Sequence, residues 1–201
     1  ELLDAAAIGL TSGEALLMLA KPGTAKTAFG DWIANALGLR YYYTSLNVET
    51  SGDDLFGPIN PMTINEKWQR VKQGMMMAPI VLLDEVGKAP AEVHHLLLPV
   101  MEERKLPVGD DRVPVPLHFL MGATNETVDD SPAFFDRFPL RVKIEYIKET
   151  SLFLKMLVAN VDEPPTEYAQ SIDRLANMRH VCKALAMFPR QSALQAMGEM
   201  F

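Results

Sequence analysis

The 201-residue sequence has little that would direct it out of the cytoplasm. Its single cysteine, Cys182, excludes a disulfide within the chain, and we interpret the thiol as a small core group. No apolar run approaches the roughly 18 residues that span a bilayer, and no signal-like leader opens the chain. We therefore expect a cytoplasmic protein without a membrane span. Because it begins at Glu1 and not at methionine, we expect a fragment or a trimmed form.

The sequence also lacks an excess of basic residues. It has 19 Lys and Arg against 26 Asp and Glu, which gives a formal net charge of −7. This balance disfavours a protein whose main task is to hold nucleic acid on a basic face, although it leaves room for a local basic loop. The four histidines lack metal-ligand spacing, and no G-x-S-x-G element or Cys/His pair indicates a covalent nucleophile.

Apolar strand-like segments alternate with helical ones, which predicts an α/β fold with a parallel sheet. Ligands then bind at the carboxyl ends of the strands. The expected strands are 14–20, 41–48, 80–84, 117–124 and 140–147, and the expected helices are 2–10, 26–37, 65–73, 91–103, 151–159 and 166–201. Residues 47–54 read as a loop, 55–62 as an irregular insertion and 107–116 as a hairpin with its tip at Gly109-Asp110. We expect an α/β core over 1–150 and a small helical lid over 151–201.

The segment 16–27, LLMLAKPGTAKT, has the strand–loop–helix layout of a phosphate-binding loop. Such a loop aims backbone N–H groups at one point, and the helix adds its positive end. Lys26 would reach the β- and γ-phosphates, and the Thr27 hydroxyl would ligate Mg²⁺. Ala20 and Ala25 replace both glycines of the G-x-x-x-x-G-K-[ST] pattern, so an ordinary strand–turn–helix corner remains the alternative.

Polar residues also follow the later strands. Asp84 would hold Mg²⁺ and Glu85 would polarise the attacking water, although two acids at a strand end could form only an exposed turn. Asn125 could hold the water or the γ-phosphate through its amide, or simply start a loop. Asn125 also begins a formal glycosylation sequon, which we set aside in a cytoplasmic chain.

Two arginines complete the candidate set. Arg137 lies between aromatic residues in FFDRF, where it could pair with Asp136 on the surface or project to the nucleotide of a neighbouring subunit. A guanidinium supplied in this way neutralises charge in the transition state. Arg190 opens the last helical segment, where it could reach the γ-phosphate or remain solvated.

Six segments in this order give the sequence a family resemblance: LAKPGTAKT, LFGPINP, IVLLDEVGKAP, HFLMGATNE, FFDRFPLRV and FPRQS. Together they resemble an AAA+ ATPase of the MoxR group, with the RavA branch as the nearest likeness. That group commonly has alanine before the loop lysine, so Ala25 fits. Ala20 and Lys21 depart from the glycine and proline that the family usually has.

The resemblance implies a five-stranded parallel sheet of order 5-1-4-3-2 plus an all-α lid. It also implies a homo-oligomeric ring, usually a hexamer, with ATP or ADP and Mg²⁺ between subunits. LFGPINP matches the helix-2 insertion, and 104–116 match the hairpin before sensor 1. The residues that match the family's nucleotide site are Pro22, Gly23, Thr24, Ala25, Lys26, Thr27 and Ala28 of the loop, Asp84 and Glu85, Asn125 as sensor 1, Arg137 as the finger and Arg190 as sensor 2.

Three classes of function fit these residues. The first is an ATP-driven ring that remodels or chaperones a protein client, often with a von Willebrand factor A domain partner. The second is a DNA-acting motor, for which the hairpin is poorly suited because 102–112 carry three positive and four negative charges. The third is a nucleotide-gated scaffold with weak turnover, which the departures at Ala20 and Lys21 leave open.

Overall fold

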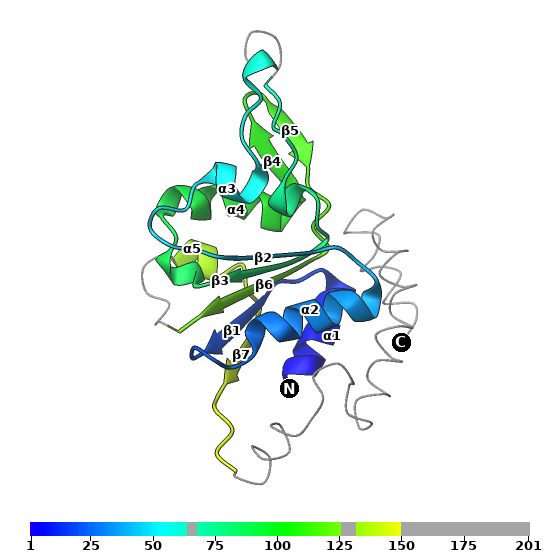
Figure 1. Cartoon of the computed structure of the whole chain (residues 1–201), viewed down its shortest axis with the longest axis vertical. Helices are drawn as coiled ribbons and strands as arrows, with labels where there is room; N and C mark the ends of the chain where they lie inside the picture. Colours follow the sequence, from blue (N-terminus) through cyan, green and yellow to red (C-terminus); the bar gives the residue numbers. More distant parts are fainter. Residues whose placement is uncertain (64–67, 126–131, 150–201) are drawn as a thin grey trace.

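The computed structural model describes residues 1–63, 68–125 and 132–149 (Figure 1). The helices are α1 (Leu2–Ser12), α2 (Lys26–Leu37), α3 (Gly52–Phe56), α4 (Ala91–Glu103) and α5 (Pro132–Phe135). The strands are β1 (Leu16–Ala20), β2 (Tyr41–Ser45), β3 (Ile80–Asp84), β4 (Lys105–Val108), β5 (Asp111–Pro114), β6 (Phe119–Thr124) and β7 (Leu140–Ile144). Short 3₁₀ turns cover Pro61–Thr63 (η1), Gly74–Met76 (η2) and Val86–Lys88 (η3).

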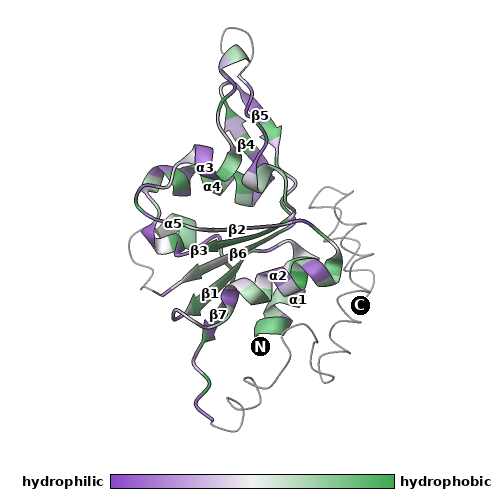
Figure 2. Ribbon diagram, viewed as in Figure 1, coloured by the Kyte–Doolittle hydropathy of each residue, from purple (hydrophilic) through white to green (hydrophobic). Residues whose placement is uncertain are grey.

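Five strands form one parallel sheet in the order β2-β3-β6-β1-β7. Numbered along the chain, this is the predicted order 5-1-4-3-2, so the α/β fold and the topology are confirmed. The central strands β3 and β6 are buried on both faces, as their continuous apolar sequences predict. Figure 2 shows the same strands in hydrophobic colours.

Alternate residues of each strand enter one of two hydrophobic cores. Leu16 and Met18 of β1 pack with α1 and α2 on one face, whereas Leu17 packs with α3, α4 and α5 on the other. This alternation follows from the two-residue period of a strand. Helices therefore cover both faces of the sheet, and the ends of its strands stay accessible (Figure 1).

A hairpin and an insertion project together from the body (Figure 1). The hairpin is β4 and β5, turning at Gly109 with φ 58°, as predicted. The predicted helix 65–73 is wrong where the structure describes it, over 68–73. There the chain is extended, and Val71 N–H donates to Pro58 O at 2.8 Å while Asn60 N–H donates to Gln69 O at 2.7 Å. Pairing with the LFGPINP segment thus engages the Val71 N–H and the Gln69 carbonyl, which a helix would need for its own hydrogen bonds.

The sequence prediction also missed α3, which falls across the expected loop and insertion. The Ser51 hydroxyl accepts from the Asp54 N–H, and the Asp54 carboxylate accepts from the Ser51 N–H. The two bonds form a capping box at the start of α3. The expected lid, 151–201, lies outside the described residues, so its boundary stays a prediction. Within the described ranges, no helix is long and apolar enough to cross a membrane.

Candidate nucleotide site

The loop between β1 and α2 adopts a conformation suited to an anion. Gly23 has φ 78° and Ala25 has φ 58°, so the left-handed backbone of a glycine position is kept although the residue is alanine. An alanine there costs about 1 kcal/mol of strain. Helix α2 starts at Lys26 with no side-chain cap and no acid in its first turn. Its first N–H groups and its positive end therefore face the loop.

Residues beyond β7 hold the loop in place. The Tyr146 hydroxyl donates to Pro22 O at 2.9 Å, and Lys21 Nζ lies 5.7 Å from the centre of the Tyr146 ring. Thr24 Oγ1 donates to Lys21 O at 2.9 Å. Lys21, which departs from the family pattern, thus has a cation–π partner. Tyr146 was missed from the sequence, where nothing links position 146 to the loop.

Lys26 and Asp84 form an ion pair between Nζ and Oδ1 at 3.0 Å. Lys26 is only 7% exposed, so its ammonium depends on this carboxylate for its charge balance. The backbone N–H of Glu85 donates to the same Asp84 oxygen at 2.9 Å. The two residues predicted to bind phosphate and Mg²⁺ therefore meet, 58 positions apart in the chain. Thr27 is exposed beside them on the first turn of α2.

The strand order brings the third predicted segment to the same edge. Strand β6 lies between β1 and β3, with Thr124 in register with Leu19 and Gly122 in register with Leu83. Asn125, which follows β6 and is exposed, thus leaves the sheet between the phosphate loop and the two acids. The carboxyl edge of the strands is where ligands bind in parallel α/β sheets.

Glu85 is held in an unusual conformation. Its φ is 55°, in the left-handed region, where a non-glycine residue is strained. Its Oε2 atom is buried, and Lys88 Nζ lies 3.3 Å away without hydrogen-bond geometry, so among the described residues this oxygen has no hydrogen-bond partner. A carboxylate oxygen with unused acceptor capacity can hold a water. The spacing Glu85-x-x-Lys88 was the available sequence signal for this contact.

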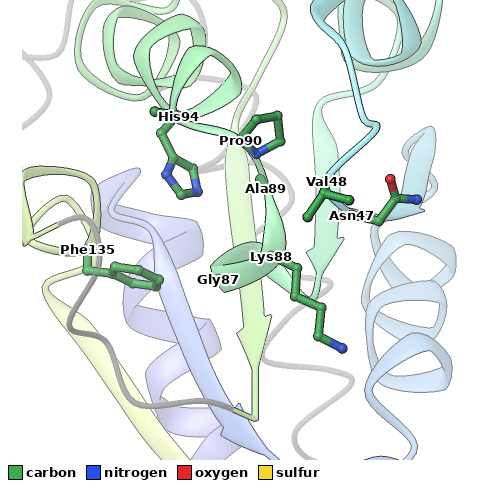
Figure 3. Close-up of a pocket in the computed structure, with 9 residues that line it drawn as sticks. Asn47, Val48, Gly87, Lys88, Ala89, Pro90, His94 and Phe135 are labelled. Carbon is green, nitrogen blue, oxygen red and sulfur yellow. The ribbon is translucent and has the colours of Figure 1, made fainter.

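Beside this turn lies a pocket of about 510 Å³, lined by Lys88, Asn47, His94 and Phe135 among others (Figure 3). His94 Nε2 hydrogen-bonds Val86 O at 2.9 Å, and its ring stacks on Phe134 with centroids 4.1 Å apart. Burial lowers the pKa of His94, and the Val86 hydrogen bond opposes this. The neutral ring therefore ties α4 to the turn that carries Glu85.

Arg137 does not meet the other candidates. It follows α5, is half-exposed, and pairs through Nη2 with Glu102 Oε1 on α4 at 2.5 Å. Arg137 thus pairs with Glu102 and not with Asp136, which was one of the two alternatives, and Arg141 Nη2 lies 3.8 Å from Asp136 Oδ1. Arg190 lies outside the described residues. Within those residues, no group of three His, Cys, Asp or Glu side chains could hold a metal by itself.

Comparison with known proteins agrees with this geometry. A family model described as the MoxR domain in the MoxR-vWA-beta-propeller ternary systems matches residues 1–180. An uncharacterised protein of Methanocaldococcus jannaschii is 31% identical over 170 residues, which cover 82% of this chain and 45% of that protein. The chaperone MoxR1 of Mycobacterium tuberculosis is 27% identical over 152 residues, which cover 73% of this chain and 40% of that protein.

Among solved structures, a crystal structure of a candidate ATPase from Cytophaga hutchinsonii matches with a TM-score of 0.63 and 22% identity. The match covers 89% of this chain and 56% of that one. This likeness concerns the fold alone. The chain spans less than half the length of the two curated relatives described above.

Proposed function

This chain belongs to the MoxR family of AAA+ ATPase domains, and we propose that it binds ATP with Mg²⁺ and hydrolyses it to ADP and phosphate. The observation that carries the proposal is the buried Lys26–Asp84 pair at 3.0 Å, between the phosphate loop and the end of β3. It joins a phosphate-binding cation to a magnesium-binding carboxylate. A purely structural turn has no need of a lysine that is 7% exposed.

The residues around this pair suit such a ligand. The backbone from Pro22 to Ala28 would cradle the phosphates, with Lys26 on the β- and γ-phosphates. Thr27 and Asp84 offer the hard oxygen donors that Mg²⁺ takes alongside phosphate and water. When bound, ATP supplies the phosphoanhydride bond that breaks, and the metal neutralises its charge. On binding, Lys26 would exchange the Asp84 carboxylate for phosphate.

Glu85 is proposed to orient and polarise the attacking water through its buried, unsatisfied Oε2. Asn125 would hydrogen-bond the water or the γ-phosphate from the adjacent strand end. Arg137, which pairs with Glu102 on α4 and not with the residues around Lys26, would act on the nucleotide of a neighbouring subunit in a hexameric ring. Arg190 would reach the γ-phosphate from the lid.

We further propose that ATP hydrolysis drives the remodelling of a protein client. The printed name of MoxR1, a chaperone, supports this, and so does the acidic net charge of −7. The matching family model supports a von Willebrand factor A domain partner. Placement in the RavA branch, cytoplasmic location and the division at residue 150 stay predictions.

ATP turnover of the full-length protein tests the proposal. Lys26→Ala should abolish nucleotide binding, whereas Glu85→Gln should bind ATP but lose about 10²-fold or more of its turnover. Glu92→Gln, which neutralises an exposed acid on α4, is the matched control and should keep the parent rate.

Other outcomes point elsewhere. Parent turnover in Glu85→Gln would refute the role given to Glu85. Assembly driven by nucleotide without any turnover would favour the scaffold, and turnover stimulated by DNA in a salt-sensitive manner would favour the DNA motor.

A further inference from the structure

The segment that carries Arg137 has a rigid base. Phe134, Phe135 and Phe138 are buried, and their ring centroids lie 5.4–6.5 Å apart. Arg137 N–H donates to Phe134 O at 3.1 Å, which closes a turn. Because the aromatic residues occupy the core, the backbone of Arg137 has one position relative to α4. Only its long side chain retains freedom.

The two arginines of this region have different tasks. Arg141 donates to Phe138 O at 3.1 Å and to Phe135 O at 2.9 Å, so its guanidinium closes the turn. In the described part of the chain, the Arg137 guanidinium makes no such contact with a backbone carbonyl. Its Nη2 reaches Glu102 Oε1, near the end of α4. Arg137 is therefore the arginine whose guanidinium can serve a group outside the chain.

We propose that Glu102 is a positioning residue for Arg137, an inference that rests on the proposed action of Arg137 on a neighbouring subunit. A guanidinium has five N–H donors, and the pair with Glu102 engages it through Nη2 alone. The other edge of the Arg137 guanidinium can then bind phosphate oxygens while Glu102 still holds the edge that carries Nη2.

The pair also reduces the freedom that the arginine must lose when the neighbour arrives. A long side chain carries substantial rotamer entropy, and holding it in advance favours the productive arrangement. The side chains of Arg137 and Glu102 are 46% and 45% exposed, so solvent screens the pair and its effect on the rate is modest. Glu102 thereby acts through Arg137 and never touches the nucleotide itself.

The adjacent acid offers a matched control. Glu103 is exposed to a similar degree at 44%, but it pairs with Arg112 of the hairpin. Glu102→Ala should lower the kcat of the assembled full-length protein about two- to fivefold, with the KM for ATP nearly unchanged. Glu103→Ala should keep the parent kcat. Glu102→Gln, whose amide oxygen still accepts from the guanidinium, should recover part of the loss.

A double variant separates positioning from a general structural role. In an Arg137→Ala background, Glu102→Ala should cause no additional loss, because its effect passes through the missing guanidinium. A further loss in that background, or a Glu102→Ala rate at or above the parent rate, overturns the inference. If Arg137→Ala itself turns over at the parent rate, the proposed finger is wrong and the inference falls with it. If only Arg137→Ala loses turnover, the finger stands and the inference alone is wrong.

Discussion

Individual residues in strained conformations mark the candidate site. In the described part of the chain, three non-glycine residues have positive φ: Ala25, Glu85 and Arg104. Two of the three are site residues, and each adjoins the Lys26–Asp84 pair in sequence. Strain of this kind persists where the surrounding structure fixes a functional geometry. Sequence reasoning named Ala25 and Glu85 from a motif, but it had no means to foresee their conformations.

Two histidines, His94 in the core and the partly buried His118, predict how stability depends on pH. Burial lowers the pKa of His94 and of His118 from 6.5, against the hydrogen bonds to Val86 O and Leu10 O. Below pH 6.5 the unfolded chain therefore takes up protons that the folded chain refuses. Stability should fall as the pH falls from 6.5 towards the folded pKa values, by at most about 1.4 kcal/mol per pH unit for each histidine.

Urea unfolding midpoints at pH 7.5 and 5.5 would measure this dependence. His118→Gln should flatten it, because that variant removes one of the two groups. If the difference between the two midpoints is unchanged in His118→Gln, another group controls the loss of stability at acid pH.

At the scale of elements, the sequence predicted the helices, strands and turns that hydrophobic periodicity and turn-forming residues indicate. The five strands of the sheet, helices α2 and α4, and the hairpin at Gly109 all follow from apolar runs and turn residues. It failed over 68–73, where pairing with Pro58 and Asn60 overrides local helical preference. Tyr146 and Glu102 were missed for the same reason, since their contacts depend on tertiary packing that no local pattern records.

The insertion gives a prediction at this scale through Gly57. Its φ is 83°, and a Cβ there would lie 1.9 Å from Val71 O, on the backbone that pairs with the insertion. Gly57→Ala must therefore displace this pairing and should cost about 2–4 kcal/mol of stability. Gly13→Ala is the comparison variant. Gly13 has ordinary left-handed backbone, with φ 74° and ψ 12°, and its nearest neighbour is an Arg104 side-chain nitrogen at 3.7 Å, whereas Gly57 at ψ 156° lies in a region that almost only glycine adopts. Gly13→Ala should cost only about 1 kcal/mol.

The thermal unfolding midpoints of the two variants would be compared with that of the parent. Equal shifts would show that neither the contact with Val71 O nor the backbone conformation of Gly57 costs more than the left-handed conformation of Gly13. A larger shift in Gly57→Ala is the expected result.

At the scale of the whole molecule, the described candidate residues fall into two groups that lie apart in one chain. Lys26, Asp84, Glu85 and Asn125 gather at one edge of the sheet, whereas Arg137 pairs with Glu102 on α4. The sequence analysis raised the possibility that Arg137 projects to a neighbouring subunit, and the packing of α5 against α4 brings it to Glu102. If Arg137 serves the reaction, a second subunit must present it to the nucleotide.

Mixing inactive subunits tests this separation directly. Lys26→Ala lacks the phosphate-binding cation but keeps Arg137, and Arg137→Ala has the converse defect. In randomly mixed rings at equal amounts, about one interface in four pairs an intact phosphate loop with an intact Arg137. Turnover should therefore recover to about a quarter of the parent rate if the sites act independently.

The control mixes Lys26→Ala with Glu85→Gln. Both defects then lie in the same half of the site, so no interface is complete and turnover should stay at the background level. Equal failure of both mixtures would mean that Arg137 does not act across a subunit boundary, whereas recovery in the first mixture alone requires that each site be built from two subunits.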